Sequence, residues 1–119
     1  MGYISVGIGG ALGAIIRYAL GTISLKMDFP LVTFLINLVG AVLIGFFVGI
    51  MMTRKDIPEN AVLFLKVGFC GGFTTFSTFS LEVLNLIESN HIFTGIIYGM
   101  ASVITCVIGV WIGRKIAMI

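Results

Sequence analysis

Residues 71–80, GGFTTFSTFS, form the segment around which the rest of this chain is arranged. They lie midway along an apolar segment that is long enough to cross a bilayer, yet they make a poor transmembrane sequence. Two adjacent glycines, Gly71 and Gly72, relax the backbone. Three phenylalanines are threaded between hydroxyl side chains, which offer donors and acceptors without net charge. These hydroxyl residues are Thr74, Thr75, Ser77, Thr78 and Ser80.

This composition predicts an interrupted helix. Backbone at membrane depth leaves the helix only where protein or a water-filled pathway satisfies its polar groups. Transport proteins place ion sites at such interruptions. The alternative is a helix-packing kink in which each hydroxyl bonds back to the preceding turn.

The composition indicates an integral membrane protein. The 119 residues are 59% hydrophobic and 10% charged, with a mean hydropathy of +1.19. A soluble chain of this length could not bury so much apolar surface, and the length suits one domain. A net charge of +2 is too small to argue for nucleic acid as a partner, and the sequence has no basic run. Cys70 and Cys106 lack metal-ligand spacing and are interpreted as packing residues.

Charged residues separate four apolar segments, and we therefore expect an all-α protein that crosses the cell inner (plasma) membrane four times. The expected spans are about 3–25, 31–53, 61–88 and 92–113, each near the roughly 20 residues that a helix needs. The third span is the one expected to break in mid-membrane. Glycine pairs at GxxxG spacing predict tight helix packing. Because four spans make a thin bundle, a twofold dimer is expected.

Polar residues of the other spans recur every four positions and so share one helical face. They suggest a polar path, although hydrogen bonds between helices would explain the same pattern. Both interpretations remain open for Asn37 and Ser102, whereas Thr105 is expected to make a hydrogen bond between helices. The stripes are Gly9, Gly13, Arg17 and Gly21 in the first span, Thr33, Asn37 and Ala41 in the second, and Tyr98, Ser102 and Cys106 in the fourth.

The chemistry of these groups suits a small anion. No carboxylate is expected at mid-membrane, and a phenyl ring is electropositive at its edge. Phe76 and Phe79 are three residues apart and should share a face of the resumed helix. Weak donors allow an anion to enter without trapping it. Arg17 marks a pathway, an ion partner or a snorkelling position, and Lys66 is interpreted as a snorkelling lysine.

Residues 68–80, GFCGGFTTFSTFS, resemble the signature of the Fluc (CrcB) fluoride channels. The resemblance extends to Arg17-Tyr18, to the NLVG stretch at 37–40 and to the four spans at this length. It implies an antiparallel, dual-topology homodimer with two fluoride pores, through which the membrane potential drives cytoplasmic fluoride out. Some members of the family instead work as pairs of related chains.

The resemblance also implies residue roles. Ring edges of the two phenylalanines would contact fluoride, and Arg17 would be a vestibule or structural cation. Backbone carbonyls of Gly71 and Thr74 would bind a central structural sodium ion shared by both protomers. A hydroxyl normally follows Ser102 one turn on, so Cys106 departs from the pattern. The implied fluoride pore contains Phe76, Phe79, Asn37, Ser77, Thr78, Tyr98, Ser102, Thr33 and Glu82.

Two other functions compete with a channel. A small proton-coupled multidrug exporter also has four spans, but it needs a carboxylate in the first span, and residues 3–25 contain none. A non-transporting assembly subunit would use every polar stripe for packing. An enzyme is disfavoured, because no nucleophile and base pair, metal cluster or phosphate loop can be assembled.

Overall fold

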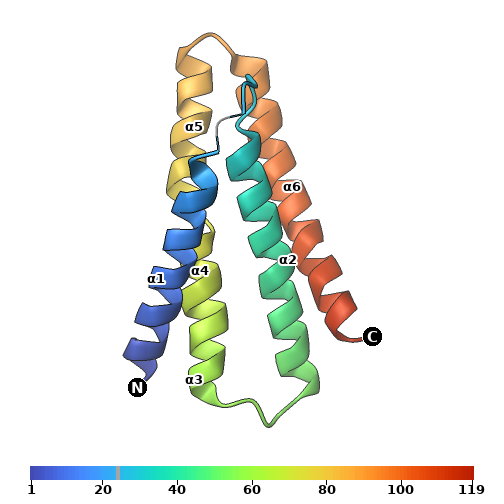
Figure 1. Ribbon diagram of the computed structural model, residues 1–119. Coiled ribbons are helices and arrows are strands. Elements are labelled where there is room, and N and C mark those ends of the chain that lie inside the picture. Colours follow the sequence, from blue (N-terminus) through green and yellow to red (C-terminus); the bar gives the residue numbers. More distant parts are fainter. Residues whose placement is uncertain (24) are drawn as a thin grey trace.

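The computed structural model describes residues 1–23 and 25–119, and its helices form an elongated bundle of 52 × 29 × 19 Å (Figure 1). The expectation of an all-helical chain is confirmed for these residues. The elements are α1 (Gly2–Gly21), α2 (Leu31–Thr53), α3 (Glu59–Val62), the π-helix η1 (Leu63–Cys70), α4 (Gly71–Phe73), α5 (Phe76–Glu88) and α6 (Ile92–Ala117).

Four helical segments are long and apolar enough to cross a membrane, namely Gly2–Gly21, Leu31–Thr53, Glu59–Glu88 and Ile92–Ala117. The first helix ends at Gly21, before the predicted end near residue 25, because the Thr22 hydroxyl bonds to the Ala19 carbonyl at 2.6 Å and closes the last turn. Ser24, inside that predicted span, lies outside the described residues. The last helix continues past residue 113 to Ala117.

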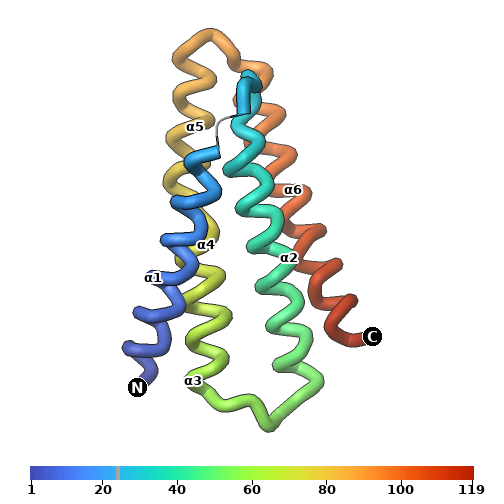
Figure 2. Tube along the Cα trace, viewed as in Figure 1, coloured from blue at the N-terminus to red at the C-terminus, as the bar shows by residue number. Residues whose placement is uncertain are grey.

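The chain runs up and down the bundle, so both termini lie at the same end (Figure 2). Helix α2 packs mainly along α6, whereas α1 packs along η1 and α4. Helix α5 packs against α6 at the opposite end. The third span, which runs from α3 to α5, therefore packs against α1 through η1 and α4 and against α6 through α5.

Glycines set the closeness of both helix pairs. A Cβ at Gly13 would collide with the Phe69 carbonyl oxygen, and one at Gly113 would collide with that of Val42. Backbones approach this closely where van der Waals packing, not the hydrophobic effect, holds helices together. The prediction from GxxxG spacing holds at these positions but not at Gly99, where a Cβ would meet nothing within 4 Å among the described residues.

The third span is not a uniform α-helix. Residues 63–70 form a π-helix, and α4 then ends at Phe73. Helical backbone resumes only at Phe76. The π-helical turns were not predicted; such turns are rare and often lie at functional sites.

Candidate ion pathway

Thr74 and Thr75 separate α4 from α5 with extended backbone. Their φ and ψ angles are −83° and 158° for Thr74, and −147° and 118° for Thr75. The Thr75 hydroxyl accepts a hydrogen bond from the Thr78 N–H at 3.2 Å and so caps the start of α5. This is the usual role of threonine at a helix N-terminus.

Asn37 on α2 satisfies the backbone of the interruption from the side. Its Oδ1 accepts from the Thr75 N–H at 2.8 Å, and its Nδ2 donates to the Thr75 carbonyl at 3.1 Å. One amide side chain thus replaces two bonds that a helix would supply. Asn37 makes hydrogen bonds between α2 and the interruption and also lines a groove beside it, so both a packing role and a place on a polar path remain open.

Arg17 on α1 supports the other side of the interruption. Its Nε donates to the Gly72 carbonyl at 3.0 Å. In an unbroken helix that carbonyl would receive the Phe76 N–H. The contact assigns Arg17 a stabilising role at the end of α4.

Two further carbonyls lose their helical donors at this point. An unbroken helix would direct the Thr75 N–H to the Gly71 carbonyl and the Thr78 N–H to the Thr74 carbonyl. The first N–H instead donates to Asn37, and the second donates to the Thr75 hydroxyl. Gly71 and Thr74, the residues predicted to bind sodium, therefore have carbonyls released from the helical ladder.

A groove of about 370 Å³ runs beside the interruption. It collects residues from α2, η1, α4, α5 and α6, and its lining is mainly apolar with a few hydroxyl, thiol and amide groups. The lining residues are Asn37, Gly40, Ala41, Ile44, Lys66, Cys70, Gly71, Thr74, Thr75, Phe76, Phe79, Ser102, Val103, Cys106 and Val110.

Phe76 and Phe79 line this groove together, as their spacing predicted. Their ring centroids lie 5.6 Å apart at an interplanar angle of 47°. Phe79 also meets Tyr98 edge to face, at 5.1 Å and 64°. Phe76 is 77% exposed, so much of its ring is free to meet another molecule.

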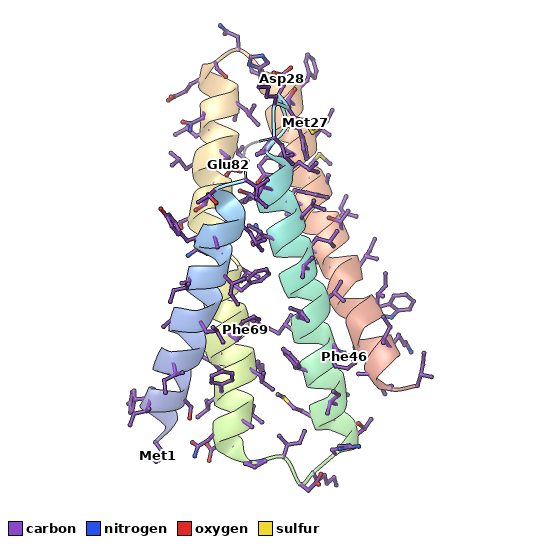
Figure 3. The ribbon with its side chains drawn as sticks, viewed as in Figure 1. Met1, Met27, Asp28, Phe46, Phe69 and Glu82 are labelled. Atoms are coloured by element: carbon purple, nitrogen blue, oxygen red, sulfur yellow. The ribbon has the colours of Figure 1, made fainter. Side chains whose placement is uncertain are left out.

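Glu82, Thr33 and Tyr98 form a hydrogen-bonded cluster next to the groove. Thr33 donates to Glu82 Oε1 at 2.6 Å, and Tyr98 donates to Oε2 at 2.9 Å. In Figure 3, Glu82 lies on α5 near the end of the bundle at which α1 ends and α2 begins. The carboxylate thus links α2, α5 and α6, and Tyr98, which is fully buried, connects it to Phe79.

The polar residues of the fourth span lie in different environments. Ser102 is 6% exposed and lines the groove, and its buried Oγ has no hydrogen-bond partner among the described residues. Cys106 lines the same groove one turn further on. Thr105 instead bonds back to the Ala101 carbonyl of its own helix at 2.7 Å, so the hydrogen bond between helices that was expected for it is not found among the described residues.

A family model described as "CrcB-like protein, Camphor Resistance (CrcB)" matches residues 4–114. The chain belongs to the CrcB family. The resemblance that residues 68–80 indicated is thereby confirmed. Among curated relatives, a protein of Methylobacterium radiotolerans named "Fluoride-specific ion channel FluC" is 41% identical over 118 residues, covering 96% of this chain and 82% of the relative.

Other relatives of this CrcB chain match over similar lengths. "Fluoride-specific ion channel FluC 2" of Clostridium acetobutylicum is 38% identical over 122 aligned residues and covers all of both chains. A protein of Nitrobacter winogradskyi, named "Fluoride-specific ion channel FluC", is 43% identical over 107 residues, covering 87% of this chain and 85% of the relative. These relatives carry the names of ion channels.

Not every predicted pore residue of this CrcB chain lies at the groove. Phe76, Phe79, Asn37 and Ser102 line it, whereas Ser77 and Thr78 do not. The Thr33, Tyr98 and Glu82 cluster lies beyond Phe79. The mutual bonding of these three residues was not predicted, since Thr33 and Glu82 are 49 positions apart and only the fold brings them together.

Proposed function

We propose that this CrcB chain forms a passive, fluoride-selective channel that lets fluoride leave the cytoplasm. The names of its relatives identify fluoride as the ion. The lining of the groove is the structural observation that best supports an anion pathway. Phe76 and Phe79 line the same groove as Asn37 and Ser102, and the Ser102 hydroxyl has no hydrogen-bond partner among the described residues. Among the described residues, no carboxylate lines this groove, so its chemistry favours an anion.

Fluoride would lie against several weak, uncharged partners. Phenyl ring edges carry partial positive charge, and the Ser102 hydroxyl can donate a hydrogen bond. An amide nitrogen has two N–H donors, and Asn37 gives one of them to the Thr75 carbonyl, so the second is available to the anion. Because each partner is weak, the ion is bound long enough to enter and is released again.

The membrane potential would supply the driving force. Moving one elementary charge across 100 mV is worth about 2.3 kcal/mol. For an anion in a cell that is negative inside, this corresponds to a roughly fiftyfold outward concentration ratio. A coupled proton or cation is therefore not needed to keep cytoplasmic fluoride low.

The proposed assembly is an antiparallel homodimer with two pores. A second copy would cover the groove and the exposed Phe76 ring, because an open groove in one protomer does not enclose an ion. Dual topology can be tested with Lys55→Cys, in the exposed loop between α2 and α3. An impermeant maleimide applied to intact cells should label about half of the protein, and labelling near zero or near completion would contradict dual topology.

A structural sodium ion is proposed at the centre of this dimer. The carbonyls of Gly71 and Thr74 fit such an ion, since both have lost their helical N–H donors and hard cations prefer oxygen ligands. Two residues from each protomer would supply four oxygens. The ion would hold the two interruptions together, and replacing sodium with a large organic cation should lower the melting temperature of the dimer.

The experiment that tests the proposal is anion efflux from proteoliposomes. The wild-type protein should release fluoride and retain chloride. Phe76→Ile and Phe79→Ile should each lower fluoride efflux roughly tenfold, which corresponds to the loss of about 1.4 kcal/mol of ring-edge interaction. Phe93→Ile is the control, because Phe93 is 83% exposed at the start of α6 and does not line the groove.

Unchanged efflux in both variants, with the dimer intact, would discard the ring-edge mechanism. Absence of fluoride efflux from dimeric wild-type protein would discard the channel itself. The multidrug exporter has little support, since α1 contains no Asp or Glu that could exchange protons for a cationic drug. Drug-stimulated proton flux would revive that alternative.

A further inference from the structure

The groove beside the interrupted helix contains one charge among its described lining residues, that of Lys66. Lys66 lies on η1, and its side chain is exposed. The other polar lining groups are hydroxyls, thiols, an amide and backbone. The ammonium group therefore stands apart from the uncharged partners along the rest of the groove.

Lys66 lies on η1, on the α3 side of the interruption, whereas Phe76 and Phe79 lie on α5 beyond it. Cys70 and Thr74 follow Lys66 at spacings of four, and all three line the groove. Phe76 is ten residues further along the chain than Lys66, and the end of η1, α4 and the extended backbone of Thr74 and Thr75 lie between them. The cation thus lines the same groove as the phenyl rings but lies on the other side of the interruption from them.

We propose, on the basis of the fluoride channel described above, that Lys66 is an anion-recruiting residue at the mouth of the pathway. Its ammonium raises the local concentration of fluoride at the mouth, and the uncharged groups then conduct the ion. A charged group lining an otherwise low-dielectric groove focuses its field along it. Because the lysine side chain is long, hydrated and exposed, it attracts anions without holding them.

Arg17 does not fill this role. Its Nε is bonded to the Gly72 carbonyl, and it is not among the groove-lining residues. The two cations near the interruption therefore have different roles. Arg17 stabilises the backbone, and Lys66 acts on the ion. Snorkelling alone would explain the exposure of Lys66, but it predicts no effect on ion flux that depends on salt.

The test compares fluoride efflux from proteoliposomes for wild type, Lys66→Gln, Lys66→Arg and Lys66→Glu at low and high ionic strength. At about 20 mM, Lys66→Gln should lower the initial efflux roughly three- to tenfold, Lys66→Glu should lower it further, and Lys66→Arg should keep it near wild type. At about 300 mM, where the Debye length is only about 6 Å, these differences should shrink to less than about twofold. Lys55→Gln is the matched control, since this exposed lysine does not line the groove, and it should behave as wild type at both salt concentrations.

Equal efflux of Lys66→Gln and wild type at low salt would overturn the proposal, and so would a reduction that is the same at both salt concentrations. Size-exclusion profiles establish that each variant is dimeric. If Lys66→Gln fails to assemble, the wild-type protein still provides a test, because its efflux must fall as salt screens the lysine, and a flat profile contradicts recruitment. Wild type without fluoride efflux at any salt concentration would defeat the channel proposal, whereas efflux indifferent to Lys66 would defeat this inference alone.

Discussion

The interface between α2 and α6 and the junction between α4 and α5 both bring backbones close together, but they do so with different chemistry. At the interface, glycines leave room for a neighbouring carbonyl, as Gly113 does for Val42. At the junction, the helix stops, and polar side chains bond to the released backbone groups. Asn37 and Arg17 supply these bonds from two different helices.

The comparison distinguishes the sequence features that serve assembly in a small membrane protein from those that point to function. Small residues at helix-packing spacing permit assembly and depend only on shape. An amide and a guanidinium can bond to the backbone of a hydroxyl-rich segment only where that backbone is not helical, because an intact helix already pairs its own N–H and C=O groups. At the junction the chain loses regular helical hydrogen bonds, and the result is a groove beside released carbonyls.

The largest expected effect lies at the interface. Gly113→Ala would place a methyl group against the Val42 carbonyl oxygen, and backbone cannot move aside as a flexible side chain can. Overpacking costs about 1–3 kcal/mol where relaxation is available, and this contact with backbone should cost more than that. Most of the protein should therefore be lost from the monodisperse fraction. The measurement is the yield of monodisperse protein after detergent extraction.

Gly99→Ala is the matched control for this prediction. It makes the same change on the same helix, where a Cβ would meet nothing within 4 Å among the described residues. Its yield should equal that of wild type. If the two variants behave alike, close approach at the interface is not what holds α2 to α6.

The second effect separates the two roles of Asn37. Asn37→Leu leaves both Thr75 backbone groups without a partner, which should cost about 2–4 kcal/mol of stability. Asn37→Asp keeps the acceptor for the Thr75 N–H but places a negative charge beside the groove, so it should retain more stability and still lower fluoride efflux by more than about tenfold. Thermal unfolding and efflux measured on the same samples check this, and wild-type efflux in Asn37→Asp would remove Asn37 from the pathway.

A smaller effect is expected at Arg17. Arg17→Gln removes the Nε donor from the Gly72 carbonyl and should lower stability by about 1–3 kcal/mol, at low and high salt alike. Thermal melting in detergent at two salt concentrations measures it. A melting temperature equal to that of wild type, combined with a salt-dependent loss of fluoride efflux, would show that Arg17 acts on the ion as Lys66 is proposed to do.

Much of the fold followed from the sequence. Four apolar segments separated by charges predicted four helices, and glycine spacing predicted the close contacts at Gly13 and Gly113, because both signals are local. The π-helical turns of residues 63–70 were not predicted. They depend on how η1 packs against its neighbours and have no residue signature of their own.

The candidate site was predictable in part. The pairing of Phe76 with Phe79 follows from helical spacing alone, whereas the bond of Thr105 within its own helix was not predicted. Two hydroxyls, those of Thr74 and Ser80, also bond back to the preceding turn, as the kink interpretation expects, although the backbone between the helices is extended as well. The joint bonding of Glu82 to Thr33 and Tyr98 needs the tertiary structure, because spacing carries no information about residues on different helices.

The smallest expected effect tests whether the pathway of weak partners continues to Cys106. This thiol lines the groove one turn beyond the unpartnered Ser102 hydroxyl, and a thiol is a weaker donor than a hydroxyl. Cys106→Ser replaces it with a stronger donor of similar size. If fluoride passes this position, efflux should rise by no more than about threefold, since one improved hydrogen bond is worth well under about 1 kcal/mol net. Thr105→Ser, on the neighbouring face, should leave efflux unchanged, because that hydroxyl is committed to the Ala101 carbonyl. An equal rise in both variants would mean that the change acts through helix packing, whereas no rise in Cys106→Ser would end the row of donors at Ser102.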